Sequence, residues 1–297
     1  MTIFVTGATG YIGGSAAARL IAEGRDVRGL VRSEEKARLL ARTGVTPVLG
    51  ELDDAALLIR EARASEGVIN AADAMHRPAL EALIEGLAGS GKALLHTSGS
   101  SVVADDARGD YASEHIFNDD TPFTPEPGKA AHVAIDRLVC NAADRGIRTV
   151  VLCDTAVYGV GRGLHRDSVQ VPLMFAQARK SGVVRHVGKG ANIWSNVHVD
   201  DMSDLYLAAL GKAPAGSFYF VENGESSFRQ IAEAISRRLG LGEPEPWSVE
   251  EAAEEWSYAY AVYAFGSNSR VRSVRARAEL GWRPRHNSLI EWIEREG

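Results

Sequence analysis

The sequence predicts an α/β protein in which a doubly wound parallel sheet carries a smaller C-terminal lobe. Up to about residue 155, short β-branched runs alternate with segments of helical period, which is the pattern of parallel strands joined by crossover helices. A glycine-rich turn separates the first strand from the first helix. After Gly163 the alternation becomes irregular, which indicates a second lobe built onto the sheet.

The elements follow from these runs in chain order. The predicted strands are Ile3–Thr6, Val27–Val31, Thr46–Leu49, Gly67–Asn70, Ala93–Thr97 and Thr149–Cys153. The predicted helices between them are Tyr11–Glu23, Glu34–Ala41, Ala55–Ala64, Pro78–Leu87 and Ala130–Asp144. Each helical stretch is long enough to connect two parallel strands. Strands and helices in this order suit a doubly wound sheet of the Rossmann type.

The second half of the chain mixes helices with isolated strands. Helical patterns cover Val171–Lys180, Asp201–Leu210, Phe228–Leu239, Val249–Glu255, Ala276–Trp282 and Leu289–Arg295, and strand patterns cover Trp194–Val199 and Ser217–Val221. We therefore predict a Rossmann domain over residues 1–163, to which 194–221 returns. Residues 164–193 and 222–297 are predicted to form a substrate-binding lobe. The segment 104–128, rich in Asp, Pro and Gly, is expected to be a mobile loop.

Composition and charge exclude several classes of function. Acidic residues outnumber basic ones by 39 to 33, which gives a formal charge of -6 and disfavours nucleic acid as the main partner. No apolar run approaches the roughly 20 residues of a membrane span. The chain starts directly with a strand and without a basic leader, so we expect a cytoplasmic protein. Cys140 and Cys153 sit in apolar stretches and are expected to be buried reduced thiols, with no metal site.

The glycine turn indicates the ligand of the sheet. Gly7, Gly10 and Gly13 follow a strand and open a helix, a spacing that permits a tight turn, close approach of a pyrophosphate and tight packing of helix on sheet. A plain turn between strand and helix is the alternative interpretation. We predict a dinucleotide site, which also includes Thr9, Tyr11 and Ile12.

The end of the second strand predicts which dinucleotide binds. An NAD site usually presents an acid there to the ribose 2'-hydroxyl, but Val31 and Arg32 occupy these positions. The Arg32 guanidinium can bind a 2'-phosphate, with Ser33 and Lys36 assisting. NADP(H) is therefore predicted in preference to NAD(H). Alternatively, Arg32 is a solvated residue that opens the next helix.

Four motifs together resemble a known family. They are Thr6–Gly14 (TGATGYIGG), Val157–Gly159 (VYG), Val197–Asp201 (VHVDD) and Leu280–Pro284 (LGWRP). The chain resembles, over nearly its whole length, the extended or atypical short-chain dehydrogenase/reductases of the NAD(P)-dependent epimerase/dehydratase group. The resemblance implies a Rossmann domain with a smaller C-terminal substrate lobe. It also implies that Glu51, Leu52, Asn70, Ala71, Ala72 and Thr97 line the cofactor.

The catalytic end departs from the family pattern. The family uses a Ser or Thr after the fifth strand and a Tyr-x-x-x-Lys pair, in which the lysine lowers the pKa of the tyrosine. An alignment on Asp136 puts Gly128 at the tyrosine and His132 at the lysine, and the serine turn puts Gly99 at the hydroxyl position. A shift of one residue brings Ser98 or Ser100 to that position.

Other proton donors are therefore considered. His132 is the first candidate, since an imidazole near neutral pKa can donate a proton; a packed helix histidine is the alternative. Tyr158 is the second candidate, with a structural tyrosine as the alternative. Ser98, Ser100 or water are further candidates, and Lys129 and Tyr111 are held in reserve.

The substrate lobe indicates an apolar substrate. Sugar-nucleotide members of the family usually carry an arginine where Trp194 stands, and an indole suggests apolar contact instead. Packing of Trp194 between the lobes is the alternative. The predicted substrate-binding residues are Ser100, Tyr158, Gln170, Trp194 and Asn196. The aromatic residues Trp256, Tyr258, Tyr260 and Tyr263 either roof this pocket or belong to the core or a dimer surface.

These observations favour an NADP(H)-dependent oxidoreductase acting on a small, partly apolar carbonyl, imine or activated alkene. An epimerase or dehydratase that retains its cofactor is one alternative, and a non-catalytic NADP(H)-binding regulatory protein is another. The resemblance further implies a homodimer formed through the helices Pro78–Leu87 and Ala130–Asp144.

Overall fold

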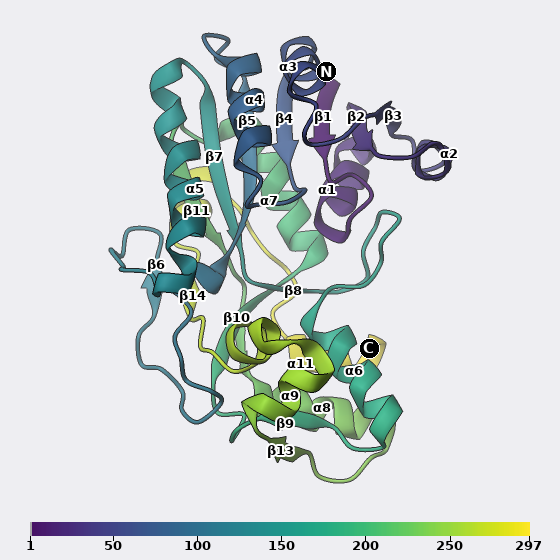
Figure 1. Ribbon diagram of the computed structural model, residues 1–297, viewed down its shortest axis with the longest axis vertical. Coiled ribbons are helices and arrows are strands. Elements are labelled where there is room, and N and C mark those ends of the chain that lie inside the picture. The colour runs from purple at the N-terminus through teal and green to yellow at the C-terminus, as the bar shows by residue number, and fades with distance from the viewer. Residues whose placement is uncertain (1) are drawn as a thin grey trace.

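A seven-stranded parallel sheet organises the first part of the molecule in the computed structural model, which describes residues 2–297 (Figure 1). Its strands are β1 (Thr2–Thr6), β2 (Asp26–Val31), β3 (Thr46–Leu49), β4 (Gly67–Asn70), β5 (Ala93–Gly99), β7 (Arg148–Asp154) and β11 (Ser217–Val221). They lie in the order β3-β2-β1-β4-β5-β7-β11. All neighbouring strands are parallel, and the direction in which successive strands are added reverses between β1 and β4, so the predicted α/β class with a doubly wound sheet is confirmed.

Helices cover both faces of this sheet. One face carries α1 (Tyr11–Ala22), α2 (Glu34–Ala41) and α7 (Val199–Lys212), and the other carries α3 (Ala55–Ala64), α4 (Arg77–Leu87) and α5 (Ala130–Asn141). Strand periodicity explains the two cores: Ile3 and Val5 of β1 face one set of helices and Phe4 faces the other. The apolar faces of α4 and α5 are buried on their own sheet, and the homodimer stays a prediction.

The C-terminal part forms a second core, below the sheet in Figure 1. It contains the helices α6 (Gln170–Ser181), α8 (Phe228–Leu239), α9 (Val249–Trp256) and α11 (Leu289–Glu296), and a π-helix over Tyr260–Phe265. Its strands are β8 (Ala156–Tyr158), β10 (Ile193–His198) and β12 (Glu225–Ser227) in one sheet, and β9 (Arg185–Val187) with β13 (Glu245–Trp247) in another.

The chain crosses between the two parts more often than the sequence indicated. Of the segment 194–221, α7 and β11 join the seven-stranded sheet, but β10 pairs with β8 and β12 instead. From the predicted substrate lobe, α10 (Arg275–Leu280) and Trp282 pack into the first core, where the indole nitrogen of Trp282 donates to the backbone oxygen of Asp201.

The segment 104–128 has little regular structure, but it is tied to the C-terminal part. Its strand β6 (Phe117–Asn118) pairs with β14 (Val271–Arg272). Asn268 hydrogen-bonds Asp105, and the Asp119 carboxylate accepts from three backbone amides. Cys140 and Cys153 are free thiols. Among residues 2–297, no helix is both long and apolar enough to cross a membrane.

Close backbone approach makes the glycine turn a structural requirement. Gly7 has φ of +72°, and a Cβ there would lie 2.3 Å from the carbonyl oxygen of Ala71. Gly24 has the same φ of +72° with nothing within 4 Å of its Cβ position. We therefore expect Gly24→Ala to cost about 1–2 kcal/mol for its left-handed backbone alone, and Gly7→Ala to cost clearly more. Urea unfolding of both variants measures the difference, and equal losses would contradict the close approach.

Candidate active site

The glycine turn lies where β1 ends and α1 begins. The Gly10 amide donates to the carbonyl oxygen of Gly7 at 2.8 Å, which closes the turn. A Cβ at Gly13 would lie 2.4 Å from that same oxygen, so the third glycine lets the helix start against the strand end. The free amides of this helix start can bind a phosphate. The turn thus has the space and donors for a pyrophosphate.

A pocket of about 510 Å³ opens beside the turn. Its lining includes the predicted cofactor residues Gly7, Thr9, Gly10, Arg32, Lys36, Glu51, Leu52, Ala71 and Ala72. It also includes Leu30, Val31, Asp53, Asp73 and His76, of which sequence reasoning had singled out only Val31. Because β1, β2 and β4 are parallel, their carboxyl ends bring these segments together. The size and donors fit the adenosine and phosphate parts of a dinucleotide.

The remaining predicted cofactor residues have structural contacts. The Tyr11 hydroxyl donates to the backbone oxygen of Gly159 at 2.9 Å, and Ile12 packs on the first core. The Ser33 hydroxyl accepts from the Lys36 amide and caps α2. Arg32 and Lys36 both have exposed side chains at the pocket, so the two cations are free to approach a ligand there.

A chain of buried polar groups crosses the sheet under the site. The Thr6 hydroxyl donates to the Asn70 side-chain oxygen, and the Asn70 amide nitrogen lies 3.1 Å from His96 Nδ1. Since an amide nitrogen donates, His96 Nδ1 accepts and Nε2 carries the ring proton. That nitrogen faces Asp136 Oδ1 at 3.8 Å. Burial lowers the pKa of His96 to about 3, so the ring is neutral.

Ser98 is hydrogen-bonded to both His132 and Asp136. Ser98 Oγ lies 2.9 Å from Asp136 Oδ2 and 3.2 Å from His132 Nε2. Ser98 is the last residue but one of β5, while the other two residues lie one turn apart on α5. The structure thus brings together two of the predicted proton donors and adds an acid that the sequence had used only to align the helix.

Burial sets the protonation of this cluster. It raises the pKa of Asp136 to about 7, against a smaller lowering by the Ser98 hydrogen bond. The pKa of His132 is lowered by burial and by the Lys129 ammonium, while Asp73 acts to raise it. Asp73 also lines the dinucleotide pocket, so its electrostatic interaction with His132 indicates that the cluster lies near this pocket. Below about pH 7 a proton therefore resides on the carboxyl, and near neutral pH the imidazole is neutral.

A second buried acid lies beside the cluster, on β7. The Tyr206 hydroxyl is hydrogen-bonded to Asp154 Oδ2 at 2.8 Å and to Thr97 Oγ1 at 2.9 Å. Burial raises the pKa of Asp154 to about 8, with the Tyr206 bond opposing the shift. Thr97, a predicted cofactor residue, is thus engaged with α7. Asp154 ends a buried strand, a signal that was visible in the sequence but was not used.

Tyr158 has contacts that correspond to a structural tyrosine rather than a proton donor. Its hydroxyl donates to the backbone oxygen of His286, and its ring packs against His198 and Trp292. Only 1% of the residue is exposed, and burial raises the pKa of its phenol. These contacts favour the structural alternative for Tyr158, and its role as a proton donor stays a prediction.

Three predicted substrate residues are also built into the core. Trp194 is buried and its indole nitrogen donates to Ser267, and Ser100 is fully buried with its hydroxyl accepting from Ser269. Asn196 is buried next to Ser226. These contacts favour packing between the lobes, the alternative considered for Trp194. Gln170 is half-buried at the start of α6.

His198, Asp200 and His286 offer three possible metal-ligand atoms within 4.8 Å of one another. The two imidazoles, however, stack with centroids 3.9 Å apart, so their in-plane lone pairs do not converge on one point. The Asp200 carboxylate accepts two hydrogen bonds from Arg162. These contacts describe a packed cluster rather than a metal centre.

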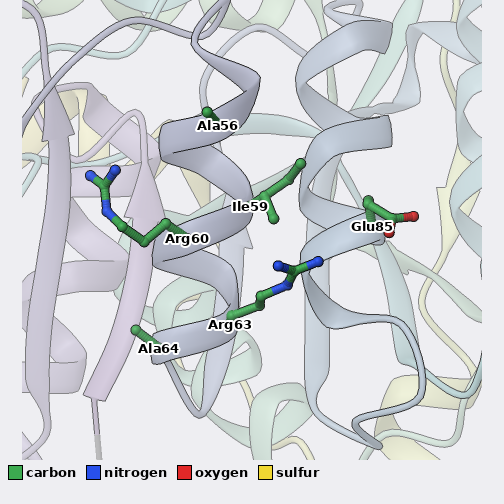
Figure 2. Close-up of a pocket in the computed structure, with 6 residues that line it drawn as sticks. All are labelled: Ala56, Ile59, Arg60, Arg63, Ala64 and Glu85. Carbon is green, nitrogen blue, oxygen red and sulfur yellow. The ribbon is translucent and has the colours of Figure 1, made fainter.

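A larger hollow of about 680 Å³ lies elsewhere, between α3 and α4. Figure 2 shows its lining side chains projecting from these two helices. It is an open surface groove, and the carboxyl ends of the strands lie away from it. We therefore assign the chemistry to the edge of the sheet.

The strand order, the glycine turn at the point where the order reverses and the adjoining pocket define a Rossmann-type dinucleotide-binding protein. The chain belongs to the NAD dependent epimerase/dehydratase family, whose model matches residues 3–221. The family predicted from the motifs is thus confirmed.

Relatives of named activity match nearly the whole chain. The oxidase ucsJ of Acremonium sp is 35% identical over 98% of this chain and 95% of the relative. The 4-hydroxy-2-methyl-3-oxo-4-farnesyl-3,4-dihydroquinoline-1-oxide ketoreductase of Stigmatella aurantiaca is 28% identical over 100% of this chain and 97% of the relative. The UDP-glucose 4-epimerase of Thermotoga maritima, solved with UDP-glucose, has a similar fold, with a TM-score of 0.77 at 19% identity over 99% of this chain and 96% of that one.

The Ser98 hydrogen bond predicts a measurable shift. Because this hydroxyl stabilises the charged Asp136 carboxylate, Ser98→Ala is expected to raise the pKa of Asp136 further above about 7. The control Ser100→Ala removes a neighbouring hydroxyl that bonds Ser269 instead. Carboxyl carbon NMR titration measures both variants. A pKa that falls in Ser98→Ala would show that the hydroxyl does not donate to the carboxylate.

Proposed function

We propose that this protein is an NADP(H)-dependent oxidoreductase that reduces a small, partly apolar substrate bearing a carbonyl, imine or activated alkene. The observation that carries the proposal is the hydrogen-bonded chain of Asp136, Ser98 and His132 at the same sheet edge as the dinucleotide pocket. A bound reduced nicotinamide nucleotide would supply the hydride. The protein has to supply the proton.

The choice of NADP(H) rests on charge at the end of β2. Arg32 and Lys36 line the pocket with exposed side chains, and Val31 stands where an acid would bind the ribose of NAD. A 2'-phosphate would meet two cations at this place, and a guanidinium binds a phosphate through two parallel hydrogen bonds. This arrangement supports NADP(H) over NAD(H).

The three side chains can pass a proton along their hydrogen bonds. The Asp136 carboxyl gives its proton to Ser98 Oγ, which gives its own to His132 Nε2. His132 can then release the proton on Nδ1 to the substrate, so the imidazole remains neutral throughout. Asp136 ends as a carboxylate that faces the Nε2 proton of His96. Because its pKa is raised, Asp136 stays protonated, and can donate a proton, up to about neutral pH.

The proposed substrate class is supported by the activity of a relative. One relative is named as a ketoreductase acting on a farnesylated quinoline oxide. We propose the same general type of chemistry here, with the carbonyl as the first group to test.

Arg32 provides the test of cofactor choice. Loss of a charge-assisted bond of about 1.5–3 kcal/mol predicts that Arg32→Ala weakens NADPH binding by roughly 10- to 150-fold. NADH binding should change little, because NADH lacks the 2'-phosphate. Arg38→Ala, which removes an exposed charge on α2, the helix that follows Arg32, is the matched control. Calorimetric titration gives both affinities, and equal losses for NADPH and NADH in Arg32→Ala would refute the assignment.

Asp136 predicts the pH dependence of reduction. Below a pKa of about 7 the carboxyl holds the proton that the chain delivers, so the reduction rate should fall as pH rises through that value. Asp136→Asn and His132→Ala are each expected to lower kcat by about 10²–10⁴-fold at pH 6.5, and Asp136→Asn should lose this pH step. NADPH absorbance with a panel of ketones, imines and enones follows the reaction.

The same assay separates the alternatives. Interconversion of a sugar without net loss of NADPH would favour an epimerase or dehydratase over the reductase. Tight NADPH binding with no turnover on the whole panel would favour a regulatory binder.

A further inference from the structure

A second polar cluster, outside the proton chain, lies at the start of α5. Lys129 Nζ donates to Ser101 Oγ at 3.2 Å and lies 4.5 Å from the ring centroid of Tyr263. Ser101 follows β5 and Tyr263 belongs to the π-helix of the C-terminal part, so both parts of the molecule contribute. All three side chains are half-buried, which leaves them accessible to a small molecule.

Two glycines leave space around this cluster. A Cβ at Gly128 would lie 3.0 Å from the Tyr263 hydroxyl oxygen, so the phenol reaches the place that a side chain at residue 128 would occupy. A Cβ at Gly99 would have no atom within 4 Å. The Tyr263 side chain thus bounds one side of the cluster, while open space remains next to Gly99 at the end of β5.

The Lys129 ammonium lacks a balancing acid. Over residues 2–297, no carboxylate forms an ion pair with Lys129, and its recorded contacts are a hydroxyl and an aromatic face. Burial lowers the pKa of this amine, which reflects the cost of holding an unpaired charge out of water. The charge also acts on His132, so the two groups are neighbours. A half-buried cation in this setting favours a ligand with negative or developing negative charge.

We propose that Lys129 and Tyr263, with Ser101, form the subsite that binds the reacting oxygen of the substrate. This inference rests on the proposed reductase function and narrows its substrate class. The oxygen would accept hydrogen bonds from the ammonium and the phenol, next to the imidazole that releases the proton.

The reaction balances with these groups. Hydride from the reduced nicotinamide adds to the carbonyl carbon, the C=O π pair moves onto the oxygen, and the resulting alkoxide is held by Lys129 and Tyr263. The alkoxide then takes one proton from His132 Nδ1. Preorganised donors stabilise such a charge most strongly in the transition state. For an enone, the same donors would hold the enolate oxygen.

The subsite selects against a cationic substrate. A protonated imine would place its positive charge against the Lys129 ammonium, which is unfavourable. The substrate class is therefore ketones, aldehydes and enones, and iminium compounds are excluded.

Two variants remove the donors with little change of shape. Lys129→Met removes the charge, and Tyr263→Phe removes the hydroxyl but keeps the ring. The matched control is Lys189→Met, which removes an exposed lysine outside this cluster. Steady-state kinetics with a ketone give kcat and KM. Calorimetric binding of benzoate, a planar oxyanion, to the complex with NADP⁺ tests the subsite without turnover, and NADPH affinity checks the fold.

We expect Lys129→Met to lower kcat/KM by about 10²–10³-fold, mainly in kcat, and to abolish benzoate binding, with NADPH affinity unchanged. Tyr263→Phe should lower kcat/KM about tenfold, and Lys189→Met should match the wild type. Unchanged benzoate affinity and kcat/KM in Lys129→Met would overturn the subsite. If the wild type reduces no carbonyl, the proposed function fails, and benzoate binding alone decides the subsite.

Discussion

The burial of one carboxyl group, that of Asp136, sets the protonation of the candidate site at the edge of the sheet. Asp136 lies on α5 and faces β5, and burial raises its pKa to about 7, so it carries a proton below about that pH. Ser98 hydrogen-bonds both this carboxyl and the half-buried His132 ring, and His96 faces the carboxyl from β5. The dinucleotide pocket, the proposed proton chain and the proposed lysine subsite all include residues at or next to the carboxyl ends of these parallel strands.

Much of the fold was predictable because strand and helix periodicities are local signals. All the strands of the seven-stranded sheet and the helices between them were found from such runs, and the glycine turn marked the dinucleotide pocket. The sequence did not predict which segments of one part pack on the other part. Pairing of β10 with β8 and β12, or packing of Trp282 on α7, depends on contacts between distant segments that leave no local period.

The site was predictable only in part for the same reason. His132 and Ser98 were chosen from a motif, but their shared partner Asp136 was used only for alignment. Asn70 and His96 lie opposite each other in adjacent buried strands, and polar residues in such strands were a usable signal. Tyr158 followed a strand end, as a ligand-binding residue does, yet its hydroxyl bonds the backbone of His286. Tyr263 reaches Gly128 from a segment far along the chain.

The transfer of hydride itself tests the account most directly. Protein incubated with NADPH deuterated at the transferable position of C4 and a ketone should give an alcohol with one deuterium on the carbinol carbon, one for each NADPH oxidised. Mass spectrometry of the product measures this ratio. Release of an isomerised or dehydrated product with the NADPH unspent would contradict a reductase and favour retained-cofactor chemistry at the same site.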